Sequence, residues 1–455
     1  MSIQTIDPAT EEVLDTYPTL DNGQLEGRIN KAHQAFRTWK KVSFEERSRL
    51  MLAAAAELKK NAEEYAEIAS REMGKTYRSA LAEVKKCAWV CEYYAQEAPV
   101  LLADETIETE ARKSYISYQP LGVILAIMPW NYPYWQVFRF AAPVLMAGNT
   151  ALLKHATNVT GCAQAIERIF RRAGFPEGAF TNLSIPTDMV KSVIEDRFVK
   201  AVTLTGSEKA GSIVASQAGA QIKKTVLELG GSDPYIILED ADLEQAVAIC
   251  AEGRLKNNGQ SCIGAKRFIV VEDVYEAFLE KFKAKMAESV MGDPFDDKTT
   301  LGPLARTDLR ENLHRQVQES IQQGAKCILG GEIPDRPGAF YPATILTEIK
   351  AGMPAYEEEL FGPVAAVFKV KDEAEAIEIA NDTDFGLGAA IFTQNIARGE
   401  RIARKEITAG SCFVNDMVNS DPRLPFGGIG VSGYGRELSA LGIREFVNIK
   451  TVSIA

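Results

Sequence analysis

Short apolar segments alternate with longer amphipathic segments through the middle of the chain. The apolar segments have strand length, and the segments between them show helical spacing of apolar positions. The expected strands are Gly122–Ile127, Thr150–Leu153, Ala179–Ile185, Ala201–Thr205 and Thr225–Glu228. The expected helices are Tyr134–Met146, Thr160–Ala173, Thr187–Asp196 and Glu208–Ala218. Strands that alternate with helices in this way predict an α/β fold with a parallel, doubly wound sheet.

The same alternation starts again after Gly230-Gly231 and predicts a second α/β domain. Its first expected elements are a strand Tyr235–Leu238, a helix ending near Lys256, a strand Arg267–Val271 and a helix Val274–Ser289. Further α/β units fill Val364 to Val414. The stretch Pro425–Gly435 is too rich in glycine for regular structure, and we expect it to be a functional loop.

Segments on either side of this alternation have other patterns. Glu45 to Leu102 is rich in Ala, Glu, Lys and Leu at helical spacing, which predicts long amphipathic helices that cover a sheet. Ser114–Tyr118 alternates like a strand, and so does the tail Glu445–Ala455, which has no partner nearby in sequence. Because such an edge strand often pairs with another subunit, we expect a homodimer or homotetramer.

Composition and charge narrow the class of protein. A chain of 455 residues predicts roughly two to three domains. The net charge of −11 comes from 62 acidic and 51 basic residues without a basic stripe, which argues against nucleic acid or a membrane surface as partner. No apolar run has the length of a spanning helix, and the first residues lack the parts of a signal peptide. We therefore expect a cytoplasmic protein.

Cysteine and histidine usage gives little support to a metal site. The 7 cysteines are an odd number in a long chain, which is typical of free thiols in a reducing compartment. Cys87 and Cys91 lie one helical turn apart, but no second pair completes a ligand set. The 3 histidines are far apart in sequence, so neither a metal nor a histidine-based triad is expected.

An isolated carboxylate and a cysteine stand out as candidate chemistry. Glu228 lies between Leu227 and Leu229, and Cys262 ends the run of small and amide residues Asn257–Cys262. A thiol with a nearby base favours covalent catalysis. Alone the signal is weak, because cysteine is among the most buried residue types and is usually structural.

Two turns after expected strands offer a ligand-binding interpretation. Thr205–Gly211 opens a helix and could hold a phosphate at the helix N-terminus, or it could be a simple β-α turn, since it does not match G-x-G-x-x-G. Asn131, in the turn Pro129–Pro133, could donate a hydrogen bond to a developing oxyanion, or it could belong to an ordinary turn.

Seven motifs in order along the chain resemble the signature set of the aldehyde dehydrogenase superfamily. They are Pro129–Pro133, Leu153-Lys154, Leu204–Ser207 with Gly211, Leu227–Gly231, Gly259–Cys262, Glu359–Pro363 and Pro425–Gly428. Within that superfamily the chain is most similar to bacterial succinate-semialdehyde dehydrogenases, chiefly through Trp135–Phe140 and Leu229–Pro234. The resemblance implies a Rossmann-like cofactor domain (1–102 and 121–230), an α/β catalytic domain (231–430) and a small oligomerisation β-extension (103–120 and 431–455).

The resemblance also implies catalytic roles. Cys262 would attack the aldehyde as a thiolate, and Asn131 would hold the oxyanion together with the Cys262 backbone N–H. Glu228 would activate the water that hydrolyses the resulting thioester. A carboxylate between two leucines at a strand end is expected to be desolvated, which favours a raised pKa and the role of a base.

Cofactor binding is implied for a second set of residues. By resemblance these are Trp130, Lys154, Thr157, Gly206, Ser207, Gly211, Glu359 and Phe361. The chain departs from the family pattern at His155, where proline is frequent, and at Thr157, where NAD-preferring members often carry glutamate. A neutral hydroxyl at Thr157 does not repel a 2′-phosphate, and Lys154 could pair with it. We expect the cofactor to be NADP or NAD, with NADP slightly favoured.

The implied substrate residues are Arg139, Trp135, Ser261 and Ser420. Arg139 lies where succinate-semialdehyde members place a carboxylate-binding arginine, and its planar fork suits a carboxylate. The alternative is a salt bridge to an acid within the fold. Ser420 matches a serine of the substrate loop, Trp135 could wall the pocket, and Ser261 could contact substrate or only fill space.

The favoured function is therefore NAD(P)-dependent oxidation of succinic semialdehyde to succinate through a cysteine thiohemiacetal and thioester. Another short aliphatic or carboxylate-bearing aldehyde, such as glutarate semialdehyde, is the alternative substrate. A cofactor-free thiol acyl-transferase or hydrolase using Cys262 and Glu228 is the rival of another enzyme class, and a non-catalytic binding protein is the third possibility.

Overall fold

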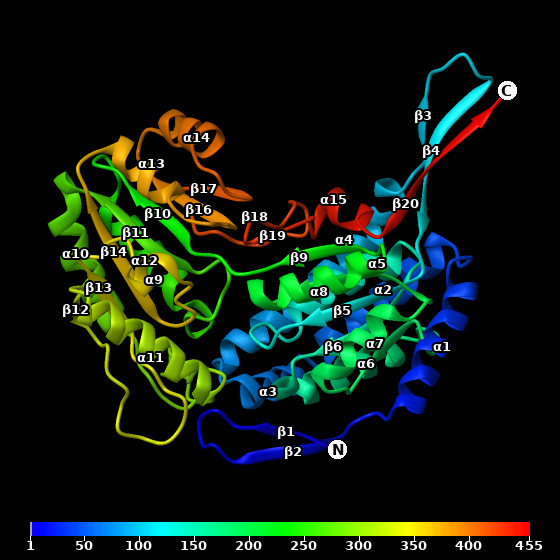
Figure 1. Ribbon diagram of the computed structural model, residues 1–455, viewed down its shortest axis with the longest axis horizontal. Coiled ribbons are helices and arrows are strands. Elements are labelled where there is room, and N and C mark those ends of the chain that lie inside the picture. The colour runs from blue at the N-terminus through cyan, green and yellow to red at the C-terminus, as the bar shows by residue number, and fades with distance from the viewer. Residues whose placement is uncertain (1) are drawn as a thin grey trace.

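The computed structural model describes residues 2–455 and has two large sheets, each covered by helices, with a separate arm (Figure 1). The first sheet has six strands in the order β19-β9-β8-β5-β6-β7. Its strands are β5 (Val123–Met128), β6 (Thr150–His155), β7 (Phe180–Asn182), β8 (Val199–Thr205), β9 (Lys224–Glu228) and β19 (Gly433–Tyr434). All neighbours are parallel except β19, which runs antiparallel to β9. The predicted doubly wound sheet is thus present.

Helices cover both faces of this sheet because its central strands are apolar throughout. β5 reads Val-Ile-Leu-Ala-Ile-Met and is buried along nearly its whole length, as expected for a parallel strand with helices on both sides. The covering helices are α1 (Asn22–Trp39), α2 (Phe44–Lys60), α3 (Ala62–Met73), α4 (Tyr77–Leu101), α5 (Trp135–Met146), α6 (Thr160–Arg172), α7 (Val190–Glu195) and α8 (Glu208–Ala220). Every residue of α5 is buried, and this helix packs against α4.

The second sheet has seven strands in the order β12-β13-β14-β11-β10-β16-β17. They are β10 (Asp233–Ile237), β11 (Ala265–Val271), β12 (Lys326–Leu329), β13 (Thr344–Thr347), β14 (Val364–Val370), β16 (Gly388–Phe392) and β17 (Ser411–Val414). The helices of this half are α9 (Leu243–Leu255), η3 (Lys256–Gly259), α10 (Glu272–Ala287), α11 (Thr307–Gln322), α12 (Pro354–Glu357), α13 (Glu373–Asn381) and α14 (Ile396–Lys405). Only β12 is antiparallel to its neighbour, so this half is also mainly parallel α/β.

A three-stranded arm extends from the first half of the molecule (Figure 1). It contains β3 (Glu105–Ile107), β4 (Lys113–Pro120) and β20 (Val447–Ile454), and β20 follows the short helix α15 (Ser439–Arg444). The C-terminal segment forms the expected strand and has no partner nearby in sequence, but it does have a distant partner in its own chain: β20 pairs with β4 from Val447↔Pro120 to Ile454↔Lys113. The sequence hides this pairing because the two strands are far apart along the chain. β20 still lies at the edge of the arm, with one side unpaired among the strands of residues 2–455.

The expectation that Pro425–Gly435 contains no regular structure is wrong. Within it, β18 (Ile429–Gly430) pairs with β15 (Phe385–Gly386), and β19 pairs with β9. Gly433 explains how so glycine-rich a segment can join a sheet. Its φ is +110°, and a Cβ there would lie 2.0 Å from the Leu227 carbonyl oxygen. The glycine permits a backbone approach that a side chain would prevent.

The observed structure also differs from the prediction at the ends of some helices and at the N-terminus. The 3-10 turn η2 (Thr187–Met189) precedes α7 where one continuous helix is predicted, and η1 (Thr157–Val159) precedes α6. Helix α1 and the hairpin β1 (Ser2–Ile6) with β2 (Val13–Pro18) were not predicted. Among the helices of residues 2–455, none is both long and apolar enough to cross a membrane.

Candidate active site

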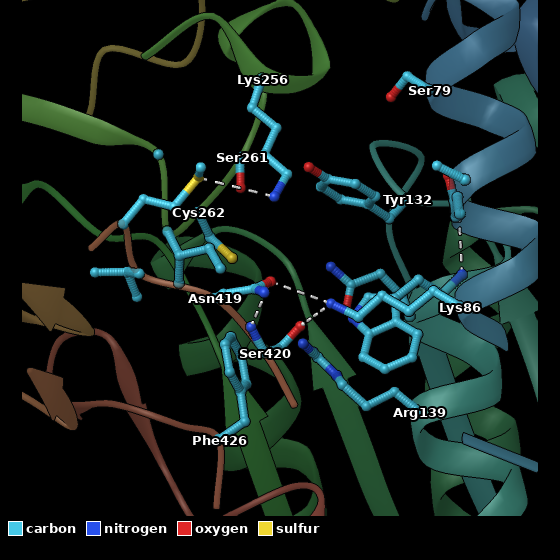
Figure 2. A pocket seen from close by; sticks show the side chains of 18 of the residues that line it. Ser79, Lys86, Tyr132, Arg139, Lys256, Ser261, Cys262, Asn419, Ser420 and Phe426 are labelled. Carbon is cyan, nitrogen blue, oxygen red and sulfur yellow. Dashed lines mark hydrogen bonds between the residues drawn. The ribbon is translucent and has the colours of Figure 1, made fainter. Parts of the chain in front are cut away.

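Cys262 lies between two cavities at the junction of the two halves. The small cavity has a volume of about 290 Å³, and the large cavity has a volume of about 640 Å³. Cys262 and Gln136 line both. The small cavity is also lined by Lys86, Tyr132, Trp135, Arg139, Lys256, Ser261, Ser420 and Phe426, most of which Figure 2 labels. A thiol at the boundary of two cavities can meet one ligand in each of them.

A tight backbone turn presents the cysteine. Asn257 and Asn258 both have positive φ angles, near +57° and +56°, a left-handed conformation that asparagine tolerates better than most residues. Gly259 follows at φ +74°, and a Cβ there would lie 2.2 Å from the Gly362 carbonyl carbon. The Asn258 side chain donates to the carbonyls of Gly74 (3.0 Å) and Pro303 (2.9 Å). The turn is therefore fixed by its own amides, which is why small and amide residues precede Cys262.

Lys266 fixes the other end of this segment. Its ammonium donates to the carbonyl oxygens of Cys262 (2.8 Å) and Ser261 (3.0 Å), and lies 3.2 Å from a carboxylate oxygen of Glu359. Lys266 is 1% exposed, so this is a buried link from the cysteine to Glu359 on the wall of the large cavity.

The cysteine thiol is protonated in this environment. Burial raises the pKa of Cys262 to about 12, and the charges of Arg139 and Lys266 oppose this rise only in part. The thiolate is the reactive form of cysteine. Attack on an electrophile therefore requires that the proton leave as the bond forms.

Asn131 stands beside the cysteine segment at the carboxyl end of β5. Its side-chain amide donates to the Gln260 carbonyl (3.1 Å), and Asn257 donates to the Asn131 carbonyl (2.9 Å). Asn131 lines the large cavity together with Cys262. Because an amide nitrogen carries two hydrogens, one remains for an oxygen bound next to the sulfur.

Glu83 and Lys75 hold the turn that carries Asn131. A carboxylate oxygen of Glu83 accepts hydrogen bonds from the backbone of Tyr134 (2.8 Å) and Trp135 (2.9 Å), at the start of α5. The Lys75 ammonium pairs with the other oxygen, and both side chains are buried. Negative charge at a helix N-terminus is favourable, so this pair stabilises the start of α5.

Glu228 ends β9 with a buried carboxylate that has no hydrogen-bond partner among residues 2–455. Burial, and then the charge of Glu437, raise its pKa well above the ordinary value, while Arg139 opposes the rise. A Cβ on Gly427 would lie 2.7 Å from the Glu228 carboxylate. Glu228 is not in the lining of either cavity; its carboxylate lies against Gly427, and the charges of Glu437 and Arg139 act on it.

Arg139 has the internal ion pair that the sequence left open as an alternative. Its guanidinium pairs with Glu437, and both side chains are almost fully buried. The guanidinium also stacks over the Phe426 ring at 4.4 Å from the centroid. Arg139 nevertheless lines the small cavity, as do Trp135, Ser261 and Ser420, so the four predicted substrate residues lie around one space.

Five of the predicted cofactor residues line the large cavity, namely Trp130, Gly206, Ser207, Glu359 and Phe361. Ser207 is the N-cap of α8, and Trp130 meets Phe361 edge to face at 5.7 Å. Three lie outside this lining, namely Lys154, Thr157 and Gly211. A Cβ on Gly211 would lie 2.7 Å from the Leu229 side chain, so α8 packs here only with glycine.

The predicted cofactor residues in and around the large cavity have the arrangement that a dinucleotide requires. The ends of β5, β6, β8 and β9 carry Trp130, Lys154, Ser207 and Glu228, and open α/β sheets bind ligands at these ends. The N-terminus of α8 offers backbone N–H groups to a phosphate. The Lys154 ammonium donates to the His155 carbonyl (2.9 Å) and has no carboxylate in ion-pair distance among the described residues. No carboxylate of the described residues neutralises this ammonium, and burial lowers its pKa, so a bound anion would stabilise its charged form.

Sequence reasoning missed four residues of this region. Lys86, Gln136 and Lys256 line the small cavity, and Glu437 pairs with Arg139. Gln136 follows Trp135 in a motif already singled out, which is a signal that could have found it. The others carry no local signal, because they come from a helix, a helix end and the C-terminal segment.

Comparison with known proteins gives consistent results. The profile of the aldehyde dehydrogenase family matches residues 1–452. The chain is 50% identical to the "Probable succinate-semialdehyde dehydrogenase", NADP(+), of Synechocystis sp. and 49% identical to the "Succinate-semialdehyde dehydrogenase 1", NADP(+), of Mycobacterium tuberculosis, in each case over 100% of both chains. It is similar, with a TM-score of 0.97 and 41% identity over 99% of each chain, to the crystal structure of succinic semialdehyde dehydrogenase from Streptococcus pyogenes in complex with NADP+.

Proposed function

The chain belongs to the aldehyde dehydrogenase family, and from this premise we propose that it oxidises succinic semialdehyde to succinate with NADP as the preferred cofactor. One observation carries the proposal: Cys262 lies between a large cavity with a dinucleotide-binding wall and a small cavity with three cationic side chains. The small cavity has the volume expected for a small ligand, at the lower end of ligand pockets. Positive charge within it favours an aldehyde that carries a carboxylate.

The first step is attack by the Cys262 sulfur on the aldehyde carbon, while the thiol proton passes to solvent water. This forms a thiohemiacetal whose oxygen is negatively charged. The Asn131 side-chain amide and the Cys262 backbone N–H donate to that oxygen. Asn131 is held for this role by its hydrogen bond to Gln260 and by the Glu83 contacts at the start of α5.

When bound, the nicotinamide supplies the hydride acceptor for oxidation of the thiohemiacetal to a thioester on Cys262. Glu228 then takes a proton from the water that hydrolyses this thioester, which releases succinate and the free thiol. In the present conformation, the Glu228 carboxylate lies against Gly427 and within the electrostatic influence of Arg139 and Glu437. Its side chain must turn toward Cys262 to act, and the lack of a fixed hydrogen-bond partner lowers the cost of that rotation.

The residues proposed to hold the cofactor divide between its two ends. Glu359, Trp130 and Phe361 contact the nicotinamide end, and the Gly206–Gly211 turn with Ser207 contacts the pyrophosphate. Lys154 and Thr157 face the adenosine ribose. Thr157 accommodates a 2′-phosphate without repelling it, which supports a preference for NADP.

The remaining parts of the proposal concern the whole chain. We propose that residues 1–102 and 121–230 form the cofactor domain, that 231–430 form the catalytic domain, and that 103–120 and 431–455 serve oligomerisation. The protein would act in the cytoplasm as a homodimer or homotetramer on a small aldehyde, without nucleic acid or membrane partners.

Initial rates with a panel of aldehydes test the function. Succinic semialdehyde, glutarate semialdehyde and butanal are each supplied with NADP and with NAD, and cofactor reduction is followed by absorbance. The expected result is the highest kcat/KM for succinic semialdehyde with NADP. Equal kcat/KM for butanal, or a strong preference for NAD, contradicts the corresponding half of the proposal. Turnover without any cofactor supports a thiol hydrolase instead.

A further inference from the structure

The small cavity contains more positive charge than the protein itself neutralises. Arg139, Lys86 and Lys256 all line it (Figure 2). Arg139 has a carboxylate partner, Glu437. Among residues 2–455, no carboxylate lies within ion-pair distance of the Lys86 or Lys256 ammonium, although Asp421 is near enough to influence the Lys86 charge. The cavity is therefore prepared for an anion.

Lys86 directs its ammonium into the cavity from α4. The ammonium lies over the Trp135 ring, 4.4 Å from the centroid, and donates to Ser420 Oγ (2.9 Å) and Asn419 Oδ1 (3.3 Å). Both acceptors are neutral. A lysine ammonium has three donors, so one remains for a further acceptor. Figure 2 shows Lys86 across the cavity from Cys262.

The protonated form of Lys86 is poorly stabilised without a ligand. Burial lowers the pKa of Lys86 to about 7, and the charges of Lys256 and Arg139 act in the same direction. Asp421 opposes this from outside ion-pair distance. A bound carboxylate would restore the charged state, because an opposite charge at short range favours it.

Arg139 is a weaker receptor for an anion than its position in the sequence suggests. Its guanidinium is already paired with Glu437 and covered on one face by Phe426. The Glu228 carboxylate belongs to the same buried cluster. A substrate carboxylate at Arg139 would therefore face a paired guanidinium and two acidic side chains, whereas at Lys86 it would face a hydroxyl, an amide and the charge of Lys256, with Asp421 outside ion-pair distance.

We infer that Lys86, with Ser420 beside it, binds the carboxylate of the substrate and gives the enzyme its preference for carboxylate-bearing aldehydes. The inference rests on the proposed function. The aldehyde carbon meets Cys262 on one side of the cavity, and the carboxylate meets the free Lys86 N–H on the other. Arg139 contributes positive charge nearby and holds Glu437. Lys256 lies exposed on the cavity lining and adds to the attraction of anions.

The test compares Lys86→Met with the wild type on two aldehydes of equal chain length, succinic semialdehyde and butanal. Methionine keeps the length of the apolar stem and its contact with Trp135 but removes the charge. We expect the KM for succinic semialdehyde to rise about ten- to hundredfold, the loss typical of a charge-assisted hydrogen bond. The KM for butanal should change less than about twofold. Lys85→Met, at the exposed neighbouring position of α4, is the matched control and should leave both KM values unchanged.

Two further variants keep the test decisive if Lys86→Met is unstable. Lys86→Arg retains the charge and should keep most of the preference, and Lys86→Gln retains a donor without charge and should lose it. Thermal melting and NADP binding identify any variant that does not fold. If the wild type prefers succinic semialdehyde and the folded Lys86→Met or Lys86→Gln keeps that preference, this inference is wrong and the proposed function stands. If the wild type itself does not prefer succinic semialdehyde over butanal, both are overturned.

Discussion

Among single residues, the nucleophile is protected in the resting enzyme because it stays protonated. The pKa of Cys262 is raised to about 12, chiefly by burial. The thiolate fraction below that pH is small and grows with each pH unit. A bound substrate, rather than a preformed thiolate, must then drive the loss of the proton.

Alkylation of the cofactor-free enzyme by iodoacetamide tests this state. Because the thiolate fraction rises tenfold per pH unit below the pKa, the rate at Cys262 should rise about tenfold per unit from pH 7 to pH 10 with no plateau. Cys262→Ala serves as the blank, since Cys327 and Cys412 are also partly exposed. A plateau below pH 9 would mean that the protein stabilises the thiolate.

The sequence predicted the site residues that lie in local motifs, and it did not predict those that lie outside them. Cys262 and Asn131 lie in short segments whose spacing marks them, and the structure brings them together on one cavity wall. Lys86 could not be found in that way, because its partner Ser420 is 334 residues away and α4 has no distinguishing motif. The sequence could not decide whether Arg139 forms an internal ion pair, for the same reason. The arginine stands in a recognisable motif, but its partner Glu437 lies far away in the sequence.

Among the strands and helices, a single glycine connects the C-terminal segment to the strand that carries Glu228. The backbone of Gly433 pairs with Glu228, at the end of β9. Its φ is positive, and a Cβ at this position would lie 2.0 Å from the Leu227 carbonyl oxygen, which leaves no room for a side chain. Residues 433–434 thus fix the edge of the sheet next to the proposed base.

Gly433→Ala should therefore destabilise the protein and reduce turnover. Backbone strain of this kind costs about 1–3 kcal/mol, which differential scanning calorimetry would show as a lower Tm. We also expect kcat to fall, because the end of β9 must shift. Gly219→Ala is the matched control, since nothing lies within 4 Å of a Cβ there and alanine is the better helix former. Equal Tm values for the two variants would show that β19 does not constrain β9.

The main strands and helices of the first sheet, and the first ones of the second sheet, followed from periodicity, whereas β12 and β13 were not predicted and the pairing of the C-terminal strands depends on distant partners. Buried parallel strands such as β5 are recognisable as continuous apolar runs. β19 is not recognisable in this way, since it is rich in glycine. β20 was expected as a strand from its alternation, but its pairing with β4, which lies far earlier in the sequence, was not. Only the folded chain shows that β19 completes the first sheet and that β4 and β20 meet in the arm.

Across the whole molecule, the arm is the regular structure that extends furthest from the two sheets (Figure 1). β20 has one unpaired edge, and Ile449 and Ile454 on it are 61% and 44% exposed. An apolar edge strand that is left open invites pairing with another chain. This supports the proposal that the arm joins subunits.

Ile449→Glu should shift the protein toward smaller assemblies by placing a charge within that interface. Light scattering coupled to size exclusion measures the mass of the wild type and the variant. Leu52→Glu, at an exposed apolar position on α2, is the control and should leave the mass unchanged. A monomeric wild type, or an Ile449→Glu variant of unchanged mass, argues against this role of the arm.

The proposed reaction depends on Cys262 carrying the substrate as a thioester that Glu228 helps to hydrolyse. Glu228→Gln should therefore accumulate this thioester, because the water that hydrolyses it is no longer activated. The variant is mixed with succinic semialdehyde and NADP, quenched in acid and measured by mass spectrometry. We expect one succinyl group on the peptide that contains Cys262, present only when NADP is added and absent in Cys262→Ala. No adduct, or an adduct on another residue, would contradict the proposed chemistry.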